Sequence, residues 1–440
     1  MPVSIAGPSR WATLRGLLPE PLTRFPHFLR DACARHGNVV AFALPWRSYV
    51  FVNEPQLVKD ILVTQQQAFS KSLGTRVLRL LLGEGLLTSE DPLHRRMRRI
   101  VQPAFHRERI AEYARVMERD ALEFADRLPP EAFDAHAAMT ELTLRIASET
   151  LFGSDESASA RTVAGALRLM MKEFPAMLTP LGALRRRLPL RDTLRFRQAH
   201  CRLDEIIYGL IERRRSDGRN RGDALSLLLA SQRAEPQSVT DEQIRDEIMT
   251  LFMAGHETTA NALTWALYLL AQNPEVQERT AAAARAGDRE HIGRVVKEVL
   301  RLYPPAWIIG RQALRDVTLA DGSFVAAKTT VFASPLLLHR RADLFADPER
   351  FDPDRWLGAE PPAFAYVPFG GGARRCIGDE FALREATIVL EVLVSRFHFS
   401  TERNARVETA PLVTLRPAGP VMMRAQTRGQ PNVEDSYSGR

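Results

Sequence analysis

The stretch Val-Pro-Phe-Gly-Gly-Gly-Ala-Arg-Arg-Cys-Ile-Gly occupies residues 367–378 and holds one of the 3 cysteines of the chain. Its three glycines allow the backbone to adopt positive φ angles and to lie flat against a large group. Arg374 offers a rigid guanidinium fork for a carboxylate. Cys376 precedes an apolar helix predicted to begin near Gly378, where amide groups and the helix dipole favour a thiolate.

Two other interpretations of this stretch are weaker. A phosphate-binding loop requires Gly-Lys-Ser/Thr after its glycines and an apolar strand before them, and the sequence has neither. A buried structural cysteine is the usual interpretation of a lone cysteine, but it does not account for the flanking glycines and arginines. The stretch therefore predicts a loop that presents Cys376 to a large bound group.

The composition is that of a globular protein with a core large enough for a bulky cofactor. The chain has 440 residues, of which 45% are hydrophobic and 26% are charged. Its net charge of +7 comes mostly from arginines in separated clusters at 95–99, 185–187 and 213–215. Nucleic-acid binders concentrate such charge on one element with aromatic residues between, so we expect solvated basic faces, or a docking patch for an acidic protein, and no nucleic-acid partner.

Cysteine use and hydropathy predict a cytoplasmic protein. Cys33, Cys201 and Cys376 are far apart and odd in number, which fits neither a disulfide framework nor a zinc site. No segment has the ~18 uncharged apolar residues that a membrane anchor requires. We expect a monomer without a membrane anchor.

The periodicity predicts a mainly helical chain with a minor β component and no internal repeat, folded as one domain over residues 1–440. Residues 1 to about 36 are expected to form a loose lead-in, with about 1–20 outside the folded body, and about 425–440 a disordered tail. The expected elements are hairpins at 39–44 with 49–52 and at 317–319 with 324–325, helices across 55–300, an irregular segment over 340–370, a helix after Cys376 and a β-like segment up to Arg424.

Residues 240–273 form the clearest predicted helix, with a Thr240–Gln243 capping box and an Asn273-Pro274 stop. Its middle reads Ala-Gly-His-Glu-Thr-Thr (254–259), which contains residues that weaken a helix. Ala254 and Gly255 are expected to share a face with Thr258. Either the helix is thinned so that another element can cross it, or a small pocket lies beside a hydroxyl and the carboxylate of Glu257.

Two further patterns place charged groups together. Glu298 and Arg301 are three residues apart on an apolar helix, which favours a buried pair with Arg355 as a third member. His94 and Arg98 are four apart on another helix. They form either a solvated basic face or a pair of donors for a cofactor carboxylate or phosphate.

In combination these motifs resemble those of the cytochrome P450 family. Residues 369–378 match its haem-binding signature F-x-x-G-x-R-x-C-x-G at every fixed position, and 254–259 resemble its oxygen-activating motif. Residues 298–301 resemble its E-x-x-R motif, which Arg355 completes. The resemblance covers about residues 20–424 and implies a triangular helical prism, with haem b held between the long central helix and the helix after the cysteine.

The resemblance also implies roles for single residues. Cys376 would be the axial thiolate of the haem iron, with Phe369 and Gly378 close to it. Glu257 and Thr258 would deliver protons to dioxygen, and Ala254 and Gly255 would lie over the haem. The implied donors to the haem propionates are His94, Arg98, Arg311 and Arg374. His94 stands where many relatives carry tryptophan, and 325–329 lacks the Pro and Gly that relatives often show, which puts the hairpin geometry in doubt.

The implied activity is the insertion of one oxygen atom from O2 into a C–H bond or a C=C bond, with electrons from a separate ferredoxin and its reductase. A docking patch for the ferredoxin is expected at Arg95, Arg96, Arg99, Arg340, Arg341 and Arg375. The expected pocket lining is Ala254, Thr258, Ala306, Trp307, Ile308, Ile309, Leu412 and Val413. These residues carry no charge, which favours a terpenoid or another lipid-like substrate.

Three alternatives remain open from the sequence. A fatty-acid hydroxylase would need a basic anchor, which Arg76 or Arg79 could supply. A haem-thiolate isomerase or dehydratase tends to lose the acid–threonine pair that this chain keeps at 257–258. A non-catalytic haem protein would not need that pair either.

Overall fold

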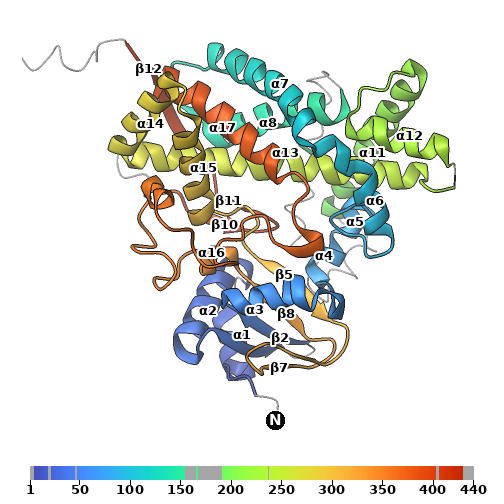
Figure 1. Cartoon of the computed structure of the whole chain (residues 1–440), viewed down its shortest axis with the longest axis vertical. Helices are drawn as coiled ribbons and strands as arrows, with labels where there is room; N and C mark the ends of the chain where they lie inside the picture. Colours follow the sequence, from blue (N-terminus) through green and yellow to red (C-terminus); the bar gives the residue numbers. More distant parts are fainter. Residues whose placement is uncertain are drawn as a thin grey trace, which may run out of the picture.

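The computed structural model describes residues 4–17, 21–44, 47–153, 165–166, 191–235, 237–402 and 406–429. It is mainly helical with small sheets, which confirms the predicted fold class. Figure 1 shows the long helices gathered in one part of the molecule and the largest sheet in the other, near the N-terminus.

The helices of the described chain are α1 (Arg10–Leu17), α2 (Pro21–His36), α3 (Pro55–Lys59), α4 (Leu73–Val77), α5 (Arg79–Leu82), α6 (Leu93–Val101), α7 (Arg107–Asp126), α8 (Ala135–Phe152), α11 (Arg191–Asp217), α12 (Ala224–Ala234), α13 (Asp241–Gln272), α14 (Pro274–Ala286), α15 (Arg289–Leu302), α16 (Pro335–Leu338) and α17 (Asp379–Arg396). Shorter turns are the π-helix η1 (Asp60–Thr64) and the 3₁₀ helices η2 (Gln66–Ala68), η3 (Gln102–Phe105), η4 (Pro353–Leu357) and η5 (Gly372–Arg374).

The strands are β1 (Val39–Leu44), β2 (Arg47–Val52), β3 (Phe69–Lys71), β4 (Phe133–Asp134), β5 (Ile309–Ala313), β6 (Val317–Thr318), β7 (Phe324–Val325), β8 (Thr330–Ala333), β9 (Phe397–Thr401), β10 (Thr409–Pro411), β11 (Leu415–Pro417) and β12 (Met422–Thr427). The largest sheet has the order β1-β2-β8-β5-β3, in which β2 and β8 are parallel and the other pairs antiparallel. Smaller sheets are β4-β12-β9, β10-β11 and β6-β7. The two hairpins expected from the sequence are the pairs β1-β2 and β6-β7.

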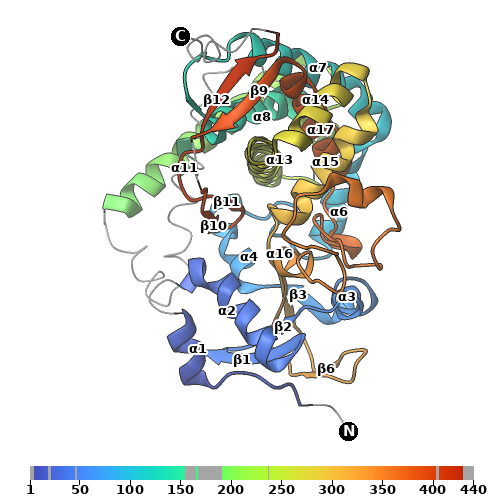
Figure 2. The ribbon, with the colours of Figure 1, turned by 90° about the vertical axis from the view of Figure 1, so that its left-hand side faces the viewer.

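Helix α13 is the centre of the helical part. Its capping box joins Thr240 and Gln243 as predicted, and Asn273 is its C-cap. Figure 2 looks almost along α13 and shows α7, α8, α14, α15 and α17 around it. Trp265 of α13 is fully buried and stacks on Tyr303, with ring centroids 4.1 Å apart. A helix that is buried over most of its surface carries polar side chains into the core, and their partners decide what the core can do.

Both ends of the chain contain regular secondary structure where the sequence predicted a loose lead-in and a disordered tail. The expected lead-in contains α1 and α2, in which Leu17 and Leu29 are buried. The frequent prolines suggested an irregular segment, but Pro26 lies inside α2. The expected tail begins with the end of β12, which pairs with β9 up to Thr427. Residues 430–440, the 185–187 arginine cluster and part of the first hairpin turn lie outside the described residues.

The described chain contains no helix long and apolar enough to cross a membrane.

Candidate active site

The cysteine loop is shaped by two glycines with left-handed backbone. Gly370 and Gly372 both have φ of +68°. A Cβ on Gly372 would lie 1.9 Å from the carbonyl oxygen of Leu62, so a side chain is excluded there. The glycines therefore do more than flatten the loop against a ligand, because one of them packs on the backbone of η1. The Cys376 amide then closes the loop by donating to the Phe369 carbonyl at 3.0 Å.

Cys376 lies at the end of this loop, and its side chain is exposed. The surrounding protein nevertheless desolvates the thiol and raises its pKa to about 11, against the opposing effect of a hydrogen bond from Gly378. Phe369 and Ile377, on either side, pack against the main hydrophobic core.

Helix α13 presents an accessible face in its buried middle. Ala254 is exposed although Leu251, Phe252 and Met253 before it are buried. The Thr258 hydroxyl is also accessible and donates to the Ala254 carbonyl at 2.7 Å. Within the part of the chain that the structure describes, no residue buries the face of Ala254 and Thr258, as a ligand site requires.

Gly255 does not belong to this face. A Cβ built on Gly255 would make ordinary contacts, both at 3.7 Å, with Ala147 and Leu151 of α8. The sequence allowed two interpretations of residues 254–259, namely a helix thinned for a crossing element and a small pocket. Each interpretation applies to different residues of the motif. Gly255 lies where α8 crosses the helix, while Ala254 and Thr258 face the interior.

The Glu257 carboxylate has a partner that the sequence did not indicate. The Thr414 hydroxyl, in the short connection between β10 and β11, donates to Glu257 Oε1 at 2.6 Å. Glu257 is half-buried and Thr414 is buried. The carboxylate is therefore held by a segment 157 residues away along the chain.

The predicted donor residues form one cluster of positive charge. The Arg374 guanidinium donates to Glu90 at 2.7 Å and to the Ser89 carbonyl at 2.8 Å, and Arg98 donates to the Arg375 carbonyl at 2.8 Å. Burial and the charge of Arg374 lower the pKa of Arg311 to about 10. The same two causes lower the pKa of His94 to about 3.

Lys71 of β3 is a fifth member of this cluster that sequence reasoning missed. Its Nζ donates to the Leu86 carbonyl at 2.8 Å, inside the protein. Burial and then the charge of Arg374 lower the pKa of Lys71 to about 7. A buried lysine two residues before α4 is not distinguishable by spacing from a surface lysine, so no sequence signal marked it.

This cluster suits an anionic ligand. Burial first, and then the charge of Arg374, lower the pKa values of Lys71, His94 and Arg311, although the carboxylates Glu90 and Asp91 lie in the same cluster. Additional carboxylates would relieve that repulsion through charge-assisted hydrogen bonds. Accessible Cys376, the open face of α13 and this cluster together fit a haem with two propionates.

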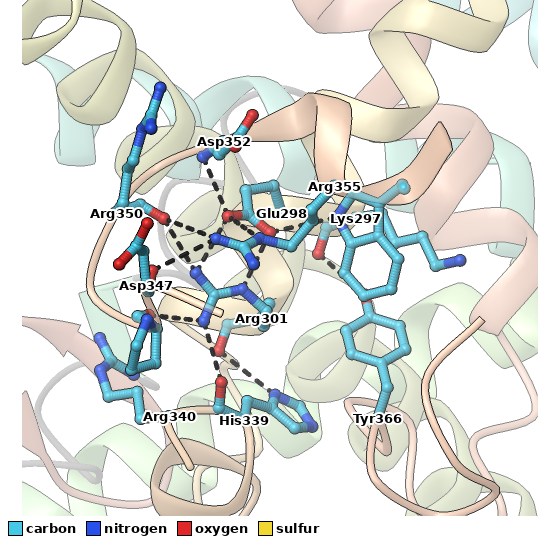
Figure 3. A network of polar contacts seen from close by, with 12 residues as sticks. Lys297, Glu298, Arg301, His339, Arg340, Asp347, Arg350, Asp352, Arg355 and Tyr366 are labelled. Carbon is cyan, nitrogen blue, oxygen red and sulfur yellow. Dashed lines mark hydrogen bonds and ion pairs between the residues drawn. The ribbon is translucent and has the colours of Figure 1, made fainter. Parts of the chain in front are cut away.

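Glu298, Arg301 and Arg355 form a buried network (Figure 3). Arg301 donates to both oxygens of Glu298 at 2.9 Å, and Arg355 donates to Oε1 at 2.9 Å. Glu298 and Arg301 are 0% exposed. Glu298 also accepts from the Trp356 indole and the Asp352 amide, while Arg301 donates to the carbonyls of His339, Pro348 and Arg350. The network thus ties α15 to the irregular segment before the cysteine loop.

His339 links this network to the cysteine loop. Its Nε2 accepts from the Val367 amide at 2.9 Å, so Nδ1 carries the proton and donates to the Arg301 carbonyl at 3.2 Å. Burial lowers the pKa of His339 to about 3, which keeps the ring neutral. A neutral ring can act as acceptor on one side and donor on the other.

The expected pocket residues separate into two groups. Ala306 is exposed, and Ile308, Ile309, Leu412 and Val413 are half-buried. Trp307 is 2% exposed, its indole donates to the Leu412 carbonyl at 3.0 Å, and its ring packs edge-on against Phe25. Trp307 is therefore a core residue that contacts the expected pocket residue Leu412, and it does not belong to the accessible group. Its large apolar side chain packs inside the protein.

Two residues of the expected docking patch are not available. Arg340 pairs with Glu349, and Arg341 pairs with Glu54 and Asp343, each with a largely buried side chain. That part of the prediction was wrong, because the acidic residues of the irregular segment fold back onto these arginines. Arg95, Arg96, Arg99 and Arg375 are exposed.

Comparisons with known proteins agree with this geometry. A family model, Cytochrome P450, matches residues 7–423. Cyclooctatin synthase of Streptomyces melanosporofaciens is 37% identical over 413 residues, covering 89% of each chain. Cyclooctat-9-en-7-ol 5-monooxygenase of the same species is 35% identical, covering 82% of each chain. Pentalenene oxygenase of Streptomyces avermitilis is 33% identical, covering 92% of this chain and 94% of the relative.

Proposed function

The chain belongs to the cytochrome P450 family and is a monooxygenase, and we propose that it oxygenates a terpenoid or a similar lipid-like hydrocarbon. We further propose that residues 1–440 act as one domain. The observation that carries the substrate class is that Ile308, Ile309, Leu412 and Val413, which we propose line the pocket, are uncharged and half-buried. The names of the three relatives refer to cyclooctatin, cyclooctat-9-en-7-ol and pentalenene, which supports the proposal.

The fatty-acid alternative needs a free basic anchor. Arg76 donates to Gln312. Arg79 donates to the Thr88 carbonyl at 3.1 Å and pairs with Glu84 at 2.9 Å. Both candidates are thus engaged by protein groups, and a carboxylate would have to displace those partners. A neutral hydrocarbon needs no such exchange.

The family implies a haem-thiolate cofactor, and we propose that Cys376 provides the thiolate. Lys71, His94, Arg98, Arg311 and Arg374 would hold the propionates. When bound, haem with a thiolate ligand supplies an electron-rich iron that favours O–O cleavage. The apolar lining keeps water away from the substrate, which strengthens polar interactions inside the site.

We propose that Glu257 and Thr258 are the residues of this chain that deliver protons during the reaction. The Thr258 hydroxyl gives its single hydrogen to the Ala254 carbonyl, which leaves its lone pairs free to accept from a group on the open face. Glu257, the next residue towards the N-terminus, is a carboxylate that takes up and releases protons. The acid–threonine pair also separates this proposal from an isomerase or a ligand carrier, which would not use it.

We expect Thr258→Ala to lower product formed per NAD(P)H oxidised by roughly 10²-fold, the size of a typical acid–base contribution. Thr258→Ser keeps the hydroxyl and should retain most of the coupling. The measurement is the ratio of product to NAD(P)H, together with the rate of the first electron transfer, which neither change should alter. If Thr258→Ala formed as much product per NAD(P)H as the unaltered protein, Thr258 would not have the proposed role in proton delivery.

We propose that electrons arrive from a separate acidic ferredoxin at Arg95, Arg96, Arg99 and Arg375. These side chains are exposed on α6 and the cysteine loop, and the two segments touch through the bond from Arg98 to the Arg375 carbonyl. Arg375 pairs with Asp379 but is still 61% exposed. The patch therefore lies next to the segment that carries Cys376.

Reversing Arg96 and Arg375 to Glu should slow reduction by an acidic ferredoxin by at least about tenfold at low salt, because charge complementarity raises association rates. The difference should shrink as the ionic strength rises. Arg30→Glu, at an exposed position on α2, is the matched control and should have no effect. Unchanged reduction rates in the double reversal would exclude this dock.

The substrate class is tested by a spectral binding screen of the haem-loaded protein. Pentalenene and other cyclic terpenes should displace the water on iron and shift the Soret band, whereas palmitic acid should do so only at much higher concentration. Tighter binding of palmitic acid than of every terpene would overturn the terpenoid proposal and favour the fatty-acid alternative.

A further inference from the structure

A series of three polar side chains, Thr414, Asn261 and His136, leads away from Glu257. His136 Nε2 lies 3.0 Å from Asn261 Oδ1, Asn261 Nδ2 lies 3.2 Å from Thr414 Oγ1, and Thr414 Oγ1 lies 2.6 Å from Glu257 Oε1. Asn261 is 0% exposed and Thr414 is 8% exposed. Such a buried series is stable because each member satisfies its neighbour.

Three separate segments bring this series together. Glu257 and Asn261 are four residues apart on α13 and so share one face. His136 is the second residue of α8, and Thr414 lies between β10 and β11. The Thr414 hydroxyl is hydrogen-bonded to the side chains of both Glu257 and Asn261 of α13.

The connection that carries Thr414 is itself well held. The Leu412 carbonyl accepts from the Trp307 indole at 3.0 Å, and the Leu415 amide donates to the Pro305 carbonyl at 2.9 Å. The Leu415 carbonyl accepts from the Trp265 indole at 3.3 Å. Thr414 is therefore a fixed point, in the same connection as the predicted pocket residues Leu412 and Val413.

The donors of this series all point the same way. An ionised Glu257 can only accept, so Thr414 must donate its one hydrogen to it. Thr414 must then accept from Asn261, which turns the amide nitrogen of Asn261 towards it. The Asn261 carbonyl is left facing His136, which must carry its proton on Nε2. One carboxylate charge thus sets the orientation of three side chains.

The same chemistry shows that the series does not conduct protons. The Asn261 amide cannot pass a proton from one side to the other in its ordinary form, because its nitrogen only donates and its oxygen only accepts. The series can still hold the carboxylate in place. We propose that Thr414 is a positioning residue that fixes the Glu257 carboxylate for proton transfer, and that Asn261 and His136 fix Thr414 in turn.

This inference rests on the proposed role of Glu257, and its test uses the haem-loaded enzyme with the terpene that binds tightest in the spectral screen. Thr414→Val keeps the volume and removes the donor. The crystal structure of this variant should show the Glu257 carboxylate displaced from its present place. Product per NAD(P)H should fall about tenfold, since a hydrogen bond to a charged group contributes at least that factor to the population of the bound conformation.

Two variants separate positioning from general damage. Thr414→Ser restores the hydroxyl and should restore both the carboxylate position and the coupling. Thr264→Val removes another buried hydroxyl of α13, which bonds only its own helix at the Ala260 carbonyl, and should change neither. If Thr414→Val does not fold, Thr414→Cys, a weaker donor, gives the same test.

A Glu257→Gln background identifies which proposal fails. In that background Thr414→Val should cause no further loss of coupling. Full coupling in Glu257→Gln would overturn the proposed role of Glu257. Reduced coupling in Glu257→Gln with an unmoved carboxylate and normal coupling in Thr414→Val would overturn the positioning role alone.

Discussion

Replacing Cys376 by serine is expected to leave a folded protein that has lost monooxygenase turnover. The side chain of Cys376 is exposed and serine is close to it in size, so folding should survive. A serine hydroxyl does not ionise near neutral pH and cannot supply the electron density of a thiolate ligand. The cations at Lys71, Arg311 and Arg374 remain and should still hold the propionates.

The measurement for this variant combines the reduced carbon-monoxide difference spectrum with turnover. The band typical of a thiolate ligand should be absent, and product should fall below detection. Cys201→Ser is the matched control, because Cys201 is also exposed but lies on α11. A retained thiolate-type band in Cys376→Ser would mean that another residue ligates the iron.

The second large effect is expected from Glu298→Gln, which should destabilise the protein by about 3–5 kcal/mol. The change leaves the charges of Arg301 and Arg355 without their shared carboxylate, and Arg301 is wholly buried. Domains are stable by only about 5–15 kcal/mol, so this loss is a large fraction of the total and should lower the urea midpoint and the haem content. Urea unfolding and haem content measure the effect.

A neighbouring ion pair provides the control. Lys297, the residue before Glu298, pairs with Glu360 at 3.0 Å, and Glu360 is 76% exposed. Glu360→Gln should cost at most about 1 kcal/mol, as for other surface pairs. Equal losses in the two variants would mean that burial of Glu298 does not govern its contribution.

The parts of the site that sequence predicted well are those with local signals. The cap at Thr240 and the stop at Asn273 predicted α13 to within a residue. The spacing of Glu298 and Arg301 required a shared face, and Arg355, predicted from the sequence as a third member, also pairs with Glu298. The glycines of the cysteine loop predicted left-handed backbone, which Gly370 and Gly372 adopt.

The parts that sequence did not predict depend on distant packing. Thr414 reaches Glu257 because β10 and β11 fold back over α13, and no local pattern encodes that approach. Arg340 resembles any exposed arginine until Glu349 folds onto it. Lys71 resembles a surface lysine in the sequence, and it is buried because β3 pairs with β5 as an edge strand of the sheet. Family resemblance suggested the proposed reacting groups, and the fold shows which residues contact them.

The central claim is that this chain inserts one atom of dioxygen into a terpenoid at the site formed by Cys376, Glu257 and Thr258. The most direct measurement is turnover under ¹⁸O-labelled dioxygen, with a ferredoxin, its reductase, NAD(P)H and the terpene that binds tightest in the spectral screen. The account predicts a product that carries a single labelled oxygen atom, with one NAD(P)H oxidised for each product molecule. A product whose new oxygen is unlabelled, or one formed without dioxygen, would contradict it.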